Sequence, residues 1–161
     1  MIRQHSAPAL TDLYETDETA WLEAMAELIE LERLGDLDYA HLAEYLADMA
    51  RRDRREVESR LKTLMAHLLK WTYQSEQRSN SWRATIILQR QELAGAVGRG
   101  VLRNQAQTVL ADVYTDAVEL AAAETGLALK TFPNQCPFSL EQLLSPDVLE
   151  EEPGENSSNK S

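Results

Sequence analysis

The chain has 161 residues, a net charge of −11 and a hydrophobic content of 43 %. This length and composition fit one folded domain with its own core, and they exclude a wholly disordered chain. The only cysteine is Cys136, which excludes an intrachain disulfide. The chain starts without the apolar core of a signal peptide, and no apolar run reaches the roughly 18 residues of a membrane helix. We therefore expect a cytoplasmic protein without a membrane partner.

The charge is unevenly distributed along the chain. Residues 51–103 contain 12 Lys/Arg and 5 Asp/Glu, whereas the remaining residues contain 4 Lys/Arg and 22 Asp/Glu. A basic helix between acidic neighbours reduces repulsion within a helical bundle. A basic surface can instead bind phosphate, nucleic acid or an acidic partner, although the acidity of the whole chain counts against general nucleic-acid binding.

Residues 1–10 are predicted to form a flexible leader. An apolar stripe then predicts a helix from about Asp12 to Gly35, with Thr16 or Asp17 as a possible N-terminal cap. Glycine tolerates the left-handed conformation that ends many helices, so we expect this helix to stop at Gly35.

The second predicted helix begins at Asp38, continues to about Trp71 and contains neither Gly nor Pro. The charged segment Arg51–Glu56 interrupts its apolar stripe and places Asp53 where an apolar residue would continue the pattern. A bend near Arg52 is the alternative, but the absence of a helix breaker favours one helix of about 34 residues, roughly 50 Å long. The stripe contains Leu42, Leu46, Met49, Val57, Leu61, Leu64 and Leu68.

Two further long helices follow a polar connection over residues 74–81. Ser79 or Ser81 is expected to cap the third helix, which places Trp82, Ile86, Leu93 and Val97 on one face. Three glycines between residues 95 and 100 end it, and the fourth helix covers residues 101–124, before Thr125-Gly126.

The remaining chain is predicted to fold back onto these helices. Phe132–Phe138 contains two prolines and forms a rigid loop, and Ser139 and Gln142 have the spacing of a capping box for a short helix. Residues 150–161 form a disordered acidic tail. The fold class is therefore all-α: an up-and-down four-helix bundle over residues 11–149, with a C-terminal loop and short helix packed on it.

The connection between the second and third helices is the best candidate for a site. Arg78, Ser79, Ser81 and Arg83 surround a helix start, where free backbone N–H groups and the helix dipole attract anions. Simple capping, with Arg78 in a salt bridge, explains the same residues. Both interpretations remain open at this stage.

His67 and Arg60 lie on one flank of the second helix. Their spacing from Glu56, Thr63 and Trp71 aligns all five along the same side of the apolar stripe. Such a line could bind an anion or transfer a proton through the imidazole, which titrates near neutrality. A structural network at the edge of the bundle is the simpler interpretation.

Trp71, Tyr73, Trp82 and Cys136 are expected to be structural. Aromatic residues at helical spacing more often pack in a core than form a binding platform, and no base accompanies the cysteine. His5, His41 and His67 do not have the paired spacing of metal ligands. The sequence therefore predicts no catalytic residue, no metal and no cofactor.

The central segment and its flanks carry a distinctive combination of residues: Arg60-Leu61, His67-Leu68-Leu69-Lys70-Trp71, Tyr73-Gln74, Arg78-Ser79, Ser81-Trp82-Arg83, Thr85-Ile86, Leu37-Asp38, Arg55-Glu56, Thr125-Gly126-Leu127, Phe132-Pro133 and Cys136-Pro137. This combination resembles the signature of domain-of-unknown-function family 29, a bacterial family expanded in cyanobacteria. The resemblance extends from about Leu13 to Leu149, and it implies an all-helical four-helix bundle without an assigned activity. The glycines between residues 95 and 100 depart from the charged, often proline-containing connection of similar proteins.

These observations favour an interaction module over an enzyme. The weak apolar stripe around the central arginines suggests contact with another protein or with a second copy of the chain. The alternative is anion, phosphate or nucleic-acid binding through residues 51–103 and the helix start at Arg78–Ser81.

Overall fold

The computed structural model describes residues 9–149, which contain α-helices and short 3-10 helices but no strand. The all-α class is thereby confirmed. Two compact units divide the chain, with the boundary between Arg52 and Asp53. The structure thus has two units where the sequence led us to expect one bundle over residues 11–149. The predicted tail and all but the last two residues of the predicted leader lie outside the described residues.

The N-terminal unit contains the first helices and the beginning of the longest one. Asp17 caps α2 by accepting a hydrogen bond from the backbone N–H of Ala20 at 3.0 Å, as predicted, while Thr16 is the last residue of α1. The single helix predicted for residues 12–35 is therefore two helices. The elements of this unit are α1 (Leu10–Thr16), α2 (Glu18–Glu30), η1 (Leu34–Asp36) and the first part of α3 (Tyr39–Tyr73).

The prediction that Gly35 ends the first long helix is wrong. The helix α2 stops at Glu30, and Glu32 takes the left-handed conformation with φ of 56°. The N–H of Arg33 bonds to the carbonyl of Leu28 at 2.8 Å, and the N–H of Glu32 bonds to that of Ile29 at 3.0 Å. These two bonds form a Schellman motif, so hydrogen bonding stabilises the turn before the glycine is reached.

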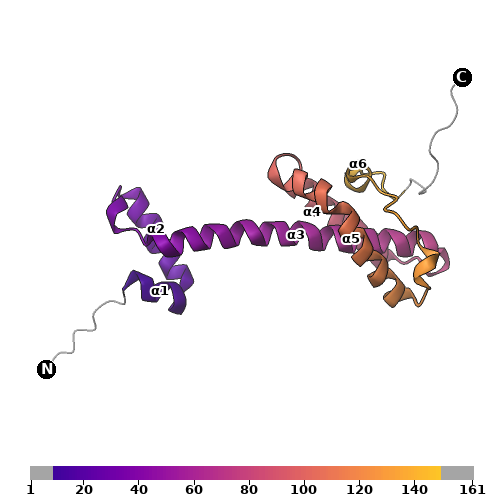
Figure 1. The fold of residues 1–161 in the computed structure, drawn as a ribbon, viewed down its shortest axis with the longest axis horizontal. Coiled ribbons are helices and arrows are strands. Elements are labelled where there is room, and N and C mark those ends of the chain that lie inside the picture. The colour runs from indigo at the N-terminus through magenta and orange to yellow at the C-terminus, as the bar shows by residue number, and fades with distance from the viewer. Residues whose placement is uncertain (1–8, 150–161) are drawn as a thin grey trace, which may run out of the picture. The chain divides into compact units, whose positions relative to one another are not determined.

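The long helix α3 extends without interruption through 35 residues, including Arg52 (Figure 1). This confirms the prediction of one continuous helix. Its burial changes along its length: all of its buried side chains lie within Val57–Lys70.

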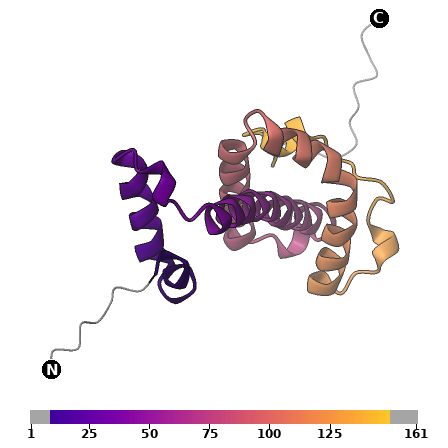
Figure 2. The same ribbon diagram turned by 60° about the vertical axis from the view of Figure 1, so that its left-hand side comes forward.

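The C-terminal unit packs the second part of α3 against α4 and α5 (Figure 2). Burial of aliphatic side chains supplies most of its stability, at roughly 25 cal/mol per Å² of apolar surface. Small residues on α5, Ala106, Ala117 and Ala121, are fully buried. The helices of this unit are α4 (Asn80–Ala96), α5 (Val101–Thr125) and α6 (Leu140–Leu144), with η2 (Ser75–Gln77) and η3 (Leu129–Thr131) between them.

The predicted return of the C-terminal segment onto the helices is confirmed. Leu140 and Leu143 of α6 have no exposed surface and belong to the main core cluster. Ser139 and Gln142 form the predicted capping box. The hydroxyl of Tyr114 donates to the carbonyl of Pro133 at 2.7 Å, which fixes the loop on α5.

Candidate functional site

One buried cation lies where α3, α4 and α5 of the C-terminal unit meet. Lys70 is only 4 % exposed, and its ammonium group donates a hydrogen bond to Glu124 of α5. The Nζ atom is 4.8 Å from the ring centre of Trp82 and 3.4 Å from Nε2 of His67. A buried charge is tolerated only with such partners, so this cluster connects the three helices electrostatically.

The contacts of His67 define its protonation state. Its Nδ1 lies 2.9 Å from the carbonyl oxygen of Thr63, which can only accept, so Nδ1 carries the hydrogen. Nε2 then has a free lone pair that accepts from Lys70. Burial lowers the pKa of His67, and the Lys70 charge lowers it further, which together outweigh the Thr63 hydrogen bond and Glu124. His67 is therefore neutral at pH 7 and serves as an acceptor.

The predicted anion-binding groups lie in the turn between α3 and α4. The Nε of Arg78 donates to the carbonyl of Trp71 at 2.7 Å, and the guanidinium lies 4.9 Å from the centre of the Trp71 ring. Ser79 caps α4 by accepting from the N–H of Trp82 at 3.2 Å. Ser81 and Arg83 are exposed in the first turn of α4. Arg78 and Ser79 thus have partners within the chain, and ligand binding here stays a prediction.

Arg60 lies apart from this turn, in a cleft of about 510 Å³ formed by α3, α4 and the start of α5. Its guanidinium donates to Glu56 at 2.7 and 2.9 Å and to Gln89 at 3.2 Å. Glu92 lies 3.7 Å away, and Asp53 also lines the cleft. Three carboxylates against one guanidinium make this lining net negative, which favours a cationic ligand over an anion.

The residues predicted to be structural lie at the packing interface of the loop and the helices. Tyr73 meets Phe132 edge to face with 5.4 Å between ring centres. Cys136 is half-buried, with its Sγ 3.9 Å from Sδ of Met65, and burial raises the pKa of its thiol. Trp71 and Trp82 are partly buried. Across residues 9–149 no group of His, Cys, Asp and Glu side chains is arranged to hold a metal ion.

The Lys70–Glu124 pair has no signal in the sequence. The two residues are 54 positions apart, and only the packing of α5 on α3 brings them together. The spacing of Lys70 from His67 was visible as one turn of helix, but nothing in the sequence indicated that this lysine would be buried.

A second polar network lies in the N-terminal unit. Asp38 accepts a hydrogen bond from Nδ1 of His41 at 2.7 Å and from Nε1 of the fully buried Trp21 at 3.1 Å. It also accepts the backbone N–H of His41, which caps α3. Burial alone raises the pKa of Asp38, but the hydrogen bonds from His41 and Trp21 outweigh it and lower the pKa below its ordinary value.

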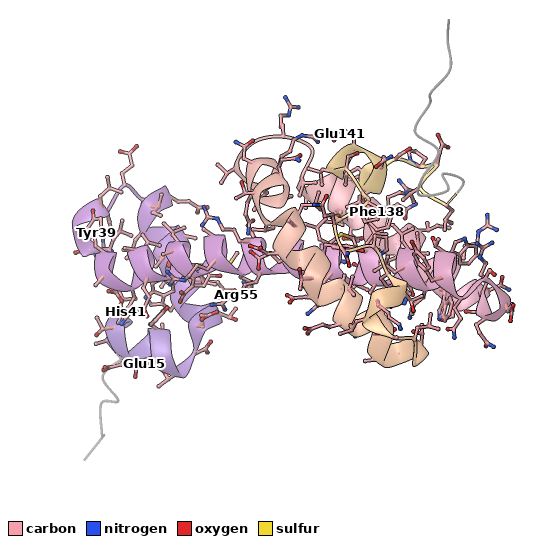
Figure 3. All side chains as sticks on the ribbon, turned by 45° about the vertical axis from the view of Figure 1, so that its right-hand side comes forward. Glu15, Tyr39, His41, Arg55, Phe138 and Glu141 are labelled. Atoms are coloured by element: carbon pink, nitrogen blue, oxygen red, sulfur yellow. The ribbon has the colours of Figure 1, made fainter. Side chains whose placement is uncertain are left out.

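Aromatic rings surround this network on one side of α3. Tyr14 stacks on His41 with 4.3 Å between ring centres and meets Trp21 edge to face at 4.8 Å. Tyr45 lies 5.8 Å from Trp21. The helices α1 and α2 thus cover the side of α3 that carries His41 and Tyr45. Tyr39 lies on another side of the helix than His41 (Figure 3).

The side of α3 that α1 and α2 leave open is apolar. Tyr39 is 59 % exposed and Leu46 is 60 % exposed, with Leu42 and Met49 partly buried between and beside them. Ala43 and Ala50 flank this line and are exposed. We call these six residues, Tyr39, Leu42, Ala43, Leu46, Met49 and Ala50, the open face of α3.

Comparison with known proteins identifies the family. A family model described as Domain of unknown function DUF29 matches residues 13–149. The chain belongs to this family. The match includes residues of both compact units and confirms the predicted family resemblance. The curated proteins and the solved structures contain no match to the chain.

No helix among residues 9–149 combines the length and apolarity needed to cross a membrane. The longest, α3, carries charged side chains in nearly every turn. Its apolar surface is a stripe, which is the pattern of a helix that packs against protein on one side.

Proposed function

We propose that this DUF29 protein is a non-enzymatic interaction module that docks another polypeptide chain on the open face of α3. One observation carries the proposal: in α3 the apolar stripe is buried from Val57 onward but exposed at Tyr39 and Leu46. Large exposed hydrophobic residues in a continuous line are a feature of protein-interaction surfaces.

The composition of the N-terminal unit supports this proposal. Among its described residues only Trp21 and Met25 are buried, whereas five large hydrophobic residues are about half exposed or more. A unit with so little core of its own gains stability when a partner covers its apolar surface. The exposed residues are Ile29, Leu31, Leu34, Tyr39 and Leu46.

The contacts of the basic residues favour protein docking over anion binding. Arg51, Arg60 and Arg103 form ion pairs with carboxylates of the same chain, and Arg78 binds the Trp71 carbonyl. A cation that already has an acidic partner attracts phosphate less. Phosphate or nucleic-acid binding through residues 51–103 is the second candidate, and it predicts an affinity that falls steeply with added salt.

The proposal is tested by replacing Leu46 with glutamine and measuring association. We expect Leu46→Gln to abolish self-association or the capture of a defined partner, without loss of helicity, because Leu46 is exposed in the free chain. The matched control is Leu88→Gln on α4, where the leucine is 52 % exposed but lies outside the open face. If the two variants and the wild type associate equally, the open face is not the docking surface.

A further inference from the structure

The open face of α3 has the spacing of a coiled-coil seam. Tyr39, Leu42, Leu46 and Met49 follow one another at intervals of three, four and three residues. This is the a/d pattern of two heptads, in which each side chain inserts between those of a facing helix. Ala43 and Ala50 are small and flank the seam, so a second helix can approach closely.

We infer that this seam pairs with the same seam of a second copy of the chain, in antiparallel orientation. The inference rests on the proposed function, because it names the occupant of the docking surface. In antiparallel pairing Leu42 of one copy faces Leu46 of the other, and Tyr39 faces Met49. All four of these side-chain pairs form at once when the two-fold axis passes at the level of Glu44. The side chain of Glu44 itself lies on the opposite side of the helix from the seam.

Charge favours this orientation over the parallel one. Arg52, Arg54 and Arg55 follow the seam, while Arg51 pairs with Asp48 of its own chain. A parallel pair would bring the arginines of both copies together, which is repulsive. The antiparallel pair places them near the turn that precedes α3 in the other copy, where Glu32 and Asp36 are exposed.

The acidity of the N-terminal unit adds to this complementarity. Its described residues carry twelve Asp/Glu and three Arg. The arginines after the seam are the main positive charges near it. In each copy an acidic region therefore precedes the seam and a basic region follows it, and an antiparallel partner presents these two regions in the reverse order. Two-fold pairing matches both regions at the same time, as a self-complementary interface requires. The seam spans only the eleven residues Tyr39–Met49, about 15 Å of helix, so we expect a weak and concentration-dependent dimer.

Sedimentation velocity over a wide concentration range tests the pairing. We expect wild type and Leu88→Gln to form dimers, and Leu46→Gln to raise the dissociation constant about tenfold or more, because two buried leucines are lost per dimer. Circular dichroism of the three proteins checks that the fold is kept. A dimer that is insensitive to Leu46→Gln overturns the inference.

Spin labels outside the seam test the orientation. Glu44→Cys and Arg51→Cys are each labelled in a Cys136→Ser background, since Cys136 is the only native cysteine. In the antiparallel pair the two Glu44 labels lie level, whereas the two Arg51 labels are offset by fourteen residues, about 21 Å along the axis. In a parallel pair both label pairs lie level, and that result overturns the inference.

The same measurements separate this inference from the proposed function. A protein that stays monomeric at the highest concentration refutes pairing with a second copy. If a different protein is then found to bind and its binding depends on Leu46, the docking function still holds. If neither form of binding depends on Leu46, both are refuted.

Discussion

Loss of the Asp38 side chain should destabilise the N-terminal unit strongly. Its carboxylate caps α3 and accepts two side-chain hydrogen bonds, one from the indole N–H of Trp21 and one from Nδ1 of His41. Loss of an N-cap costs about 1 kcal/mol, and a buried N–H left without an acceptor costs about 1–3 kcal/mol. We therefore expect Asp38→Ala to lower the free energy of unfolding of this unit by about 2–4 kcal/mol.

Tryptophan fluorescence during urea denaturation measures this loss directly. Trp21 is the only tryptophan outside the C-terminal unit, so a Trp71→Phe, Trp82→Phe background restricts the signal to the N-terminal unit. If the two units unfold in separate steps, the Asp38 substitution should move only the step seen by Trp21.

Two matched variants make the interpretation specific. Asp38→Asn keeps a good capping residue and an acceptor for Trp21 but loses the charge, so its effect should be less than half that of Asp38→Ala. Asp36→Ala removes an exposed carboxylate paired with Arg33 and should change stability by no more than about 0.5 kcal/mol. If Asp38→Ala costs as little as Asp36→Ala, the Asp38 network does not stabilise the unit as we argue.

Three further predictions concern the C-terminal unit. The folded pKa of His67 is lowered, so its contribution to stability is present above the unfolded value of about 6.5 and is lost as the pH falls through the folded value. Thermal melts at a series of pH values should show this loss in the wild type and not in His67→Gln, and the same pH dependence in both proteins would contradict the lowered pKa of His67. Burial raises the pKa of the Cys136 thiol, so native protein should react with a disulfide reagent more slowly than urea-unfolded protein, and equal rates would refute this. Gly126→Ala should lower the free energy of unfolding by about 1 kcal/mol because φ at this position is +73°. Gly95→Ala should raise the free energy of unfolding by about 0.5–1 kcal/mol, because Gly95 is helical and an added Cβ meets no other atom. If denaturation shows the same sign of change for both variants, the backbone argument is contradicted.

Local signals in the sequence predicted the helices well. The absence of Gly and Pro predicted one long α3, and the spacing of Ser139 and Gln142 predicted the capping box of α6. These features depend on interactions within a few residues, which the sequence displays directly. The end of α2 was predicted wrongly because the helix ends in a hydrogen-bonded turn at Glu32, before it reaches Gly35. The stability of that turn depends on backbone geometry, which the sequence does not display.

The candidate sites depended more on tertiary contacts. The sequence placed His67 on a flank of α3 and identified Arg78 and Ser79 at a helix start, and the structure found them there. It could not show that His67 accepts from a buried Lys70, because that burial requires Glu124 and Trp82 from other helices. The Asp38 network was likewise hidden, since Trp21 reaches Asp38 only when α2 packs on α3.

By itself, the sequence determined that this protein is helical, where most helices begin and end, and which family it belongs to. These properties follow from periodicity, capping residues and a specific motif, all of which are local. The tertiary structure alone decided which part of the α3 stripe is buried and which is exposed. Leu46 and Leu61 look alike in the sequence, but only Leu61 is covered by other helices, and that difference motivates the proposed docking surface.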